Sequence, residues 1–190
     1  HFAAILYEHD LMESEKLVLG VIWDGTGLGD DGNSWGGEFF SWNSYEMKRL
    51  SHLSYFPLIL GDKMAREPRL SALALAPKLY RSLVGTRFTL KEWNVYTVVL
   101  ETEKSKTSSM GRLFDAVASW CGLCDSASFE GEAALLLEES AATFFAENKR
   151  YFQSYPIEYL HGKIDTMDLI NHVIDDIKNG TRTQEVAARF

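Results

Sequence analysis

Residues 23 to 39, with the sequence WDGTGLGDDGNSWGGEF, decide how the fold of this chain is predicted. An apolar run at residues 17–23, rich in β-branched side chains, comes directly before Asp24 and indicates a buried strand rather than a helix. Asp24 is therefore expected at the end of a strand. The glycines that follow let the backbone take positive φ angles and let a ligand approach its amide groups.

The Asp-Gly-Thr-Gly segment at residues 24–27 would place a carboxylate, a hydroxyl and bare amides at one edge of the sheet. Amides and the Thr26 hydroxyl suit the oxygens of a nucleotide phosphate, and Asp24 suits a hard divalent cation. The same glycines are equally compatible with a β-hairpin that turns at Asp31 and Gly32 and binds nothing. The spacing alone leaves both interpretations open.

A helix is predicted to begin at Ser109, which is a favourable N-cap residue. One face of this helix carries a single carboxylate among small side chains: Asp115, Ala118, Ser119 and Gly122. A solvated face would normally carry Lys and Glu, so something packs closely here, either another helix or a ribose bound by Asp115. We expect Asp115 to face a cleft shared with Asp24 and Thr26, without a Lys or Arg partner from its own helix.

The remaining periodicity predicts an α/β protein with a short, mostly antiparallel sheet packed with several helices. Beyond the first strand, strands are expected at 35–42 and 45–53, helices at 1–12, 64–83, 90–103 and from about 130, 165 and 183, and a loop at 152–162. Pro68 is tolerated only in the first turn of a helix, so the helix at 64–83 should begin near Glu67.

Composition limits the possible functions. A chain of 190 residues can bury one core, and its formal net charge of −8, without clustered Lys or Arg, argues against a nucleic-acid partner. No apolar run is long enough to span a membrane and no signal peptide is recognisable, so we expect a cytoplasmic protein without a membrane partner. Cys121 and Cys124 have a C-x-x-C spacing, but they follow an apolar helical pattern rather than open a helix, which disfavours a redox role.

Three long motifs, in the same order, resemble those of the hydrogenase-maturation carbamoyltransferases of the HypF type. They are DGTGLGDDGNSWGGEF at 24–39, SSMGRLFDAVA at 108–118 and FEGEAA at 129–134. The resemblance implies one lobe of an actin-like, Hsp70-like (ribonuclease H-like) ATPase fold. It further implies a single partial carbamoyltransferase domain over 1–190, with the end of a preceding helix at 1–14, a sheet with the glycine-rich loop at 15–60 and a helical part at 61–190.

The same resemblance implies a site for ATP or carbamoyl-adenylate and for a divalent metal. Asp24 would be catalytic and would ligate the metal together with His1. The implied nucleotide-binding residues are Gly25, Thr26, Gly27, Asp115, Glu130, Gly131 and Glu132. The two glutamates could also serve only to complement the dipole of the helix that they open.

Arg66 and Arg69 lie in a segment, REPR, that resembles the REPWR of the family but lacks its aromatic residue. Both arginines could hold a carbamoyl or phosphate oxygen. They could instead cap and solubilise the end of a helix, and the residues alone favour this structural role over ligand binding.

The function implied by the resemblance is carbamoyl transfer. The whole enzyme would use carbamoyl phosphate and nucleotide to form carbamoyl-adenylate, and would pass the carbamoyl group to the C-terminal cysteine of a hydrogenase-maturation partner. Because the family's first metal histidine would precede residue 1 and its last metal aspartate would follow residue 190, we expect this chain to be part of a larger enzyme. The alternatives are another carbamoyl-adenylate enzyme, such as an O-carbamoyltransferase or a tRNA threonylcarbamoyl transferase, and a non-catalytic docking lobe.

Overall fold

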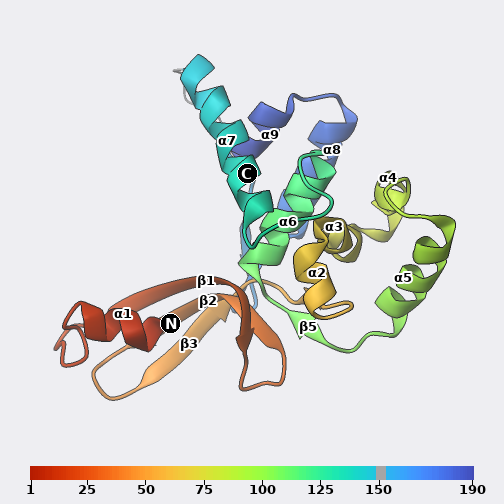
Figure 1. Ribbon diagram of the computed structural model, residues 1–190. Helices are drawn as coiled ribbons and strands as arrows, with labels where there is room; N and C mark the ends of the chain where they lie inside the picture. Colours follow the sequence, from red (N-terminus) through yellow and green to blue (C-terminus); the bar gives the residue numbers. More distant parts are fainter. Residues whose placement is uncertain (149–152) are drawn as a thin grey trace.

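The computed structural model describes residues 1–148 and 153–190. A sheet of long antiparallel strands extends away from a cluster of helices that contains the C-terminus (Figure 1). The predicted α/β class is confirmed, and the sheet is mixed because one of its strand pairs is parallel.

Three strands form most of the sheet: β1 (Val18–Leu28), β2 (Ser34–Trp42) and β3 (Met47–His52). They pair antiparallel, with β2 between the other two. Two short strands complete it: β4 (Phe56–Pro57) and β5 (Lys106–Thr107). Because β5 pairs in parallel with Ser34 of β2, the helix that follows β5 begins next to the glycine-rich stretch.

The helices are α1 (Phe2–Glu8), α2 (Asp62–Arg66), α3 (Pro68–Leu75), α4 (Ser82–Gly85), α5 (Leu90–Thr102), α6 (Met110–Trp120), α7 (Glu132–Glu147), α8 (Met167–Lys178) and α9 (Thr183–Arg189), with a 3₁₀ turn, η1, at Lys78–Tyr80. Helix α6 packs against α3, α7 and α8. Its apolar face, which includes Leu113 and Val117, is buried in the main core. Helix α6 is therefore the element on which the helical part is assembled.

The helix predicted at 64–83 is not continuous, because two prolines divide the segment, but its predicted start near Glu67 is confirmed, since Glu67 is the N-cap of α3. Glu67 leaves the helical region with φ −123° and ψ 84°, as expected for a residue that precedes a proline, and α3 then begins at Pro68. Ala76, with ψ 124°, precedes Pro77 and ends α3 in the same way. The range therefore contains the end of α2, all of α3, the 3₁₀ turn η1 and the start of α4.

The predicted loop at 152–162 is also corrected. Residue 152 lies outside the described residues. A short hairpin begins within the range with β6 (Glu158–Leu160) and continues beyond it with β7 (Lys163–Asp165). Within the described residues, no helix is long and apolar enough to cross a membrane. The division of the chain at residues 14 and 60 stays a prediction.

Helix α1 lies on the sheet and places His1 near the glycine-rich stretch. The Phe2 ring stacks on Phe40 of β2, with 6.0 Å between the ring centroids. It also covers Gly20 of β1 so closely that a Cβ atom there would lie 2.5 Å from the ring. A larger residue than glycine at position 20 would therefore displace α1 and, with it, His1.

Candidate functional site

The Asp-Gly-Thr-Gly segment forms a bulge inside β1. Trp23 is paired with Gly37 and Gly27 with Trp35, so residues 24–26 lie opposite Gly36 alone. Asp24 is therefore not at the end of the strand, as predicted, because the extra residues are absorbed in the bulge and the strand continues beyond them. The hairpin interpretation also holds in part, since β1 and β2 are joined by a tight turn. The bulge and the hairpin turn therefore occur together in the β1–β2 pair.

The N-terminus of α6 packs directly on this bulge. The Ser109 hydroxyl donates to the carbonyl oxygens of Asp24 and Gly25 at 3.0 and 2.8 Å, and it accepts the Arg112 amide at 3.1 Å as the predicted N-cap. A Cβ atom on Gly36 would lie 2.5 Å from the Asp24 carbonyl oxygen and 2.9 Å from the Ser109 Cα. The bulge and α6 can approach this closely only because residue 36 is a glycine.

We therefore expect Gly36→Ala to destabilise the chain by about 1–3 kcal/mol, because its Cβ atom meets backbone that cannot move aside easily. Urea unfolding measures this change. Gly85→Ala is the matched control, since a Cβ atom there would lie 3.6 Å from the Trp93 ring, an ordinary contact. Equal free energies of unfolding for the two variants would contradict the proposed fit between the bulge and α6.

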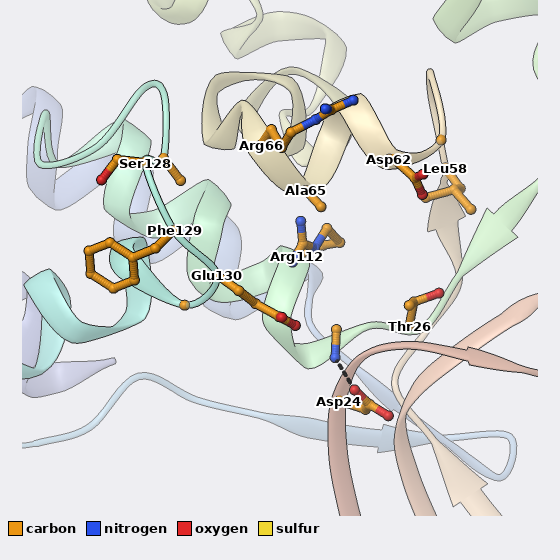
Figure 2. A pocket seen from close by; sticks show the side chains of 14 residues that line it. Asp24, Thr26, Leu58, Asp62, Ala65, Arg66, Arg112, Ser128, Phe129 and Glu130 are labelled. Atoms are coloured by element: carbon orange, nitrogen blue, oxygen red, sulfur yellow. Dashed lines mark hydrogen bonds between the residues drawn. The ribbon is translucent and has the colours of Figure 1, made fainter.

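A cavity of about 590 Å³ opens beside the bulge, a volume within the range of small-molecule sites. It is enclosed by β1, α2, the start of α6 and the segment that leads into α7 (Figure 2). Its lining residues are Asp24, Gly25, Thr26, Leu58, Gly61, Asp62, Ala65, Arg66, Arg112, Ala127, Ser128, Phe129, Glu130 and Gly131. The structure thus brings together two segments, 24–26 and 130–131, that the sequence predicted to share a site.

Three of the predicted nucleotide-binding residues, Gly27, Glu132 and Asp115, do not line this cavity. Gly27 lines a second cavity of about 400 Å³ on the α1 side of the sheet, which His1 and Asp24 also line. Glu132, in the first turn of α7, accepts hydrogen bonds from the Ser128 amide and hydroxyl, and these bonds lower its pKa. Glu132 therefore has a structural task in fixing the segment before α7, and its contact with a nucleotide stays a prediction.

The surroundings of the Asp115 carboxylate differ from those predicted. Its Oδ2 atom lies 2.9 Å from Nη1 of Arg112, so the carboxylate does have an arginine partner on its own helix, one turn away. The residue is 6% exposed, and burial raises the pKa of this carboxyl to about 6, although the Arg112 charge opposes the rise. Its neighbours Ala118 and Ser119 are fully buried, and α6 packs against other helices. The small-residue face around Asp115 is therefore packed against other helices and not against a ribose.

Arg112 is the cavity residue that the sequence analysis missed. It was quoted in a motif without a role, although it lies three residues before Asp115, a spacing that places the two side chains together on a helix. In Figure 2 its side chain lies between Ala65 of α2 and Thr26 of β1. The guanidinium is therefore part of the cavity wall.

Of the two arginines left ambiguous by the sequence, only Arg66 lines the cavity. Arg69 is bound elsewhere: it donates to the Glu67 carboxylate at 2.6 Å, to the Glu92 carboxylate at 2.8 Å and to the Arg87 carbonyl at 2.7 Å. Arg69 thus holds α3 against the start of α5, which is the structural interpretation of this residue. Arg66 retains the ligand-binding alternative.

His1 and Asp24 form the candidate metal centre. The His1 Nε2 and Asp24 Oδ2 atoms are 3.0 Å apart, while Asp24 Oδ1 accepts the Gly25 amide at 2.7 Å. An imidazole and a carboxylate suit a divalent cation. In the described part of the chain, however, no cluster of three or more His, Cys, Asp or Glu side chains could hold a metal. The two residues fit a cation as a partial ligand set.

The two cysteines are free thiols. Burial raises the pKa of Cys121 to about 12 and also raises the pKa of Cys124. A raised pKa keeps a thiol protonated and unreactive, in agreement with the low weight given to a redox role.

The structure is an α/β domain in which a glycine-rich bulge and a helix N-terminus border a cavity of the size of small-molecule sites. The family model described as "Carbamoyltransferase, Kae1-like Domain, second subdomain" matches residues 20–190. The chain belongs to this carbamoyltransferase family, as the three motifs indicated.

Similar proteins agree with this assignment. The chain is 35% identical to the carbamoyltransferase HypF of Synechocystis over 73% of its length, and 38% identical to carbamoyltransferase HypF2 of Cupriavidus necator over 76%. It spans 20% and 18% of these two proteins.

Among solved structures, full-length HypF in its phosphate- and nucleotide-bound form matches 99% of the chain, with a TM-score of 0.85 and 28% identity, and the match covers 29% of that protein. HypF of T. kodakarensis matches all of the chain, with a TM-score of 0.77 and 27% identity, and the match covers 26% of that protein.

Proposed function

We propose that this chain supplies part of the nucleotide site of a carbamoyltransferase of the HypF type. The observation that carries the proposal is the convergence of residues 24–26 and 130–131 on one cavity. Support also comes from a solved HypF of the same fold that is described as phosphate- and nucleotide-bound. Because the chain spans only about a fifth of the first relatives, the activity is proposed for the assembled enzyme.

In the proposed site, the Thr26 hydroxyl and the backbone of Gly25, whose amide donates to Asp24, border the phosphate groups of ATP, and Gly27 borders the ligand from the side of the second cavity. The segment of Glu130 and Gly131 lies along the nucleotide, with Glu132 fixing its position at the start of α7. Gly131 suits this role because its φ of +83° turns the chain sharply into the helix.

A divalent cation, when bound, would neutralise phosphate charge and polarise the group under attack. His1 and Asp24 would be two of its ligands, and Asp24 is held ready by the hydrogen bond from the Gly25 amide. The Asp24 carboxylate lines both cavities, so it can reach a metal on the His1 side and still border the nucleotide cavity.

The proposed reaction is the one implied by the family resemblance. The assembled enzyme would convert carbamoyl phosphate to carbamate with release of phosphate, and the carbamate would displace pyrophosphate from ATP to form carbamoyl-adenylate. The C-terminal cysteine of a hydrogenase-maturation partner would then take up the carbamoyl group, with release of AMP. An actin-like, Hsp70-like lobe and a cytoplasmic location belong to the same proposal. The name of the family model, which places this segment in a carbamoyltransferase, favours this reaction over the docking lobe.

A chimera tests the proposal. The chain would replace the matching segment of the Synechocystis carbamoyltransferase HypF, to which it is 35% identical. We expect the chimera to release AMP in a reaction that depends on carbamoyl phosphate. A folded chimera that binds no ATP and releases no AMP would contradict the proposed function.

A further inference from the structure

Arg112 is a buried arginine with unused hydrogen-bonding capacity. The residue is only 9% exposed, yet its Nε and Nη1 atoms have no hydrogen-bond partner among the described residues. Nη1 lies 2.9 Å from Asp115 Oδ2, but this ion pair lacks the geometry of a hydrogen bond, and Oδ2 is likewise without one. Buried donors in this state are costly, so a native arginine of this kind needs a physical reason.

Arg81 also has an Nε atom without a partner among the described residues, but it does not line the cavity, and two other mostly buried arginines are fully engaged. Arg69 binds Glu67, Glu92 and the Arg87 carbonyl. Arg49 donates to Glu38 at 2.6 Å and stacks on an aromatic ring. An arginine retained only for stability would be expected to form such bonds, and often bidentate ones. Arg112 instead lines a cavity. Its Nη2 atom, unlike Nε and Nη1, is not fully buried; it forms no hydrogen bond with the described residues and lies 3.5 Å from where a Cβ atom on Gly25 would be.

Arg66 of α2 lines the same cavity, opposite the bulge, and makes no ion pair with the described residues. The two arginines therefore border one space from two helices. Arginine presents planar, fork-like donors that match the oxygens of a phosphoryl group. A helix N-terminus, that of α6, faces the same region and adds partial positive charge.

The cavity also carries carboxylates, Asp24, Asp62 and Glu130, which repel an anion. An anion can be held beside them when its charge is shared with a cation, as happens when Mg²⁺ is bound by one or two carboxylates and by substrate phosphates. The arginines and the carboxylates would then serve opposite parts of one ligand. An uncharged ligand would pair with neither the arginines nor the carboxylates.

We propose that Arg112 and Arg66 form a phosphoryl-binding wall of this cavity, and that Asp115 is a positioning residue that holds Arg112 in place rather than a ligand of ribose. The inference rests on the proposed function and deepens it, because it names the charged part of the ligand and the residues that bind it. The Asp115 carboxylate faces Nη1 and fixes the guanidinium by charge, which leaves Nη2, without a partner among the described residues, to the phosphoryl oxygens.

Calorimetry with ATP, AMP and adenosine tests this wall in the wild-type chimera and its variants. We expect Arg112→Gln and the exposed Arg66→Gln each to weaken ATP binding by about 10- to 100-fold, the effect of losing a charge-assisted hydrogen bond. Adenosine binding should change less than about twofold, because adenosine carries no phosphoryl group. Asp115→Asn should lower the ratio of ATP to adenosine affinity in the same direction, by a smaller factor.

Arg182→Gln is the matched control, since Arg182 pairs with Glu147 on the exposed surface and leaves both affinities unchanged. Inorganic phosphate and carbamoyl phosphate, titrated alone, show whether a free phosphoryl compound also uses the wall. If either compound binds to the wild type but not to Arg112→Gln, the result supports phosphoryl binding by the wall.

Unchanged ATP affinity in both Arg66→Gln and Arg112→Gln would overturn the inference, and so would an equal loss of ATP and adenosine binding. Wild-type binding of ATP and adenosine with equal affinity would overturn the inference alone and leave the nucleotide site intact. Binding of neither compound by the wild type would overturn the proposed function as well.

Discussion

Replacing Asp24 with asparagine is expected to reduce AMP release by the chimera at least about 100-fold, because metal-based charge stabilisation in such reactions amounts to several kcal/mol. The substitution is nearly isosteric, and the Asn side-chain oxygen can still accept the Gly25 amide that Asp24 Oδ1 accepts at 2.7 Å. What is lost is the negative charge beside His1 Nε2. The expected defect is therefore chemical, and the free energy of unfolding should change little.

The control for this prediction is Asp30→Asn, an equal change of charge at an exposed position of the hairpin turn. Steady-state AMP release and urea unfolding, measured on both variants, separate loss of activity from loss of fold. If Asp24→Asn retains the wild-type rate, Asp24 is not the charged group on which the reaction depends.

Replacing Glu38 with alanine is the substitution expected to destabilise the fold most, by about 3–5 kcal/mol, as for the removal of one member of a buried ion pair. The Glu38 side chain is 3% exposed. Its Oε1 atom accepts the amides of Gly36 and Gly37 at 3.2 Å and the Ser108 hydroxyl, and its Oε2 atom accepts Arg49 Nε at 2.6 Å. One carboxylate thus ties β2, β3 and the start of α6 together.

Urea unfolding of Glu38→Ala and of Glu138→Ala, an exposed glutamate on α7, measures the difference. The control should stay within about 0.5 kcal/mol of the wild type. Since the bonded glycine amides are next to the bulge, Glu38→Ala should also weaken ATP binding. A loss below about 1 kcal/mol would mean that water replaces the carboxylate and that the network does not hold the sheet against α6.

The sequence predicted the elements whose signals are local. The N-cap Ser109 and the apolar face of the following helix predicted α6 correctly, and the helix predicted at 90–103 agrees with α5. The bulge was missed, because a Gly-x-Gly pattern that ends an apolar run has the composition of a turn. Only the pairing of Gly27 with Trp35 across the hairpin reveals that the strand continues.

The site was predictable in part. Resemblance to the family selected segments 24–27 and 130–132, but their shared cavity depends on how α6 and α7 pack, which no local pattern contains. The small side chains around Asp115 were correctly taken as a sign of close packing, yet its partner was missed because Arg112 was not considered at the i−3 position. A search for charge pairs along that helix would have found it.

The central claim is that the bulge and the segment before α7 bind one nucleotide, and amide NMR of the chimera, isotope-labelled in this segment and titrated with ATP, tests it most directly. We expect the amide signals of Gly25, Thr26 and Gly131 to shift together with a single dissociation constant. Those of Gly162 and Gly180, which do not line the cavity, should stay in place. Shifts at only one of the two segments, or none at either, would contradict the account.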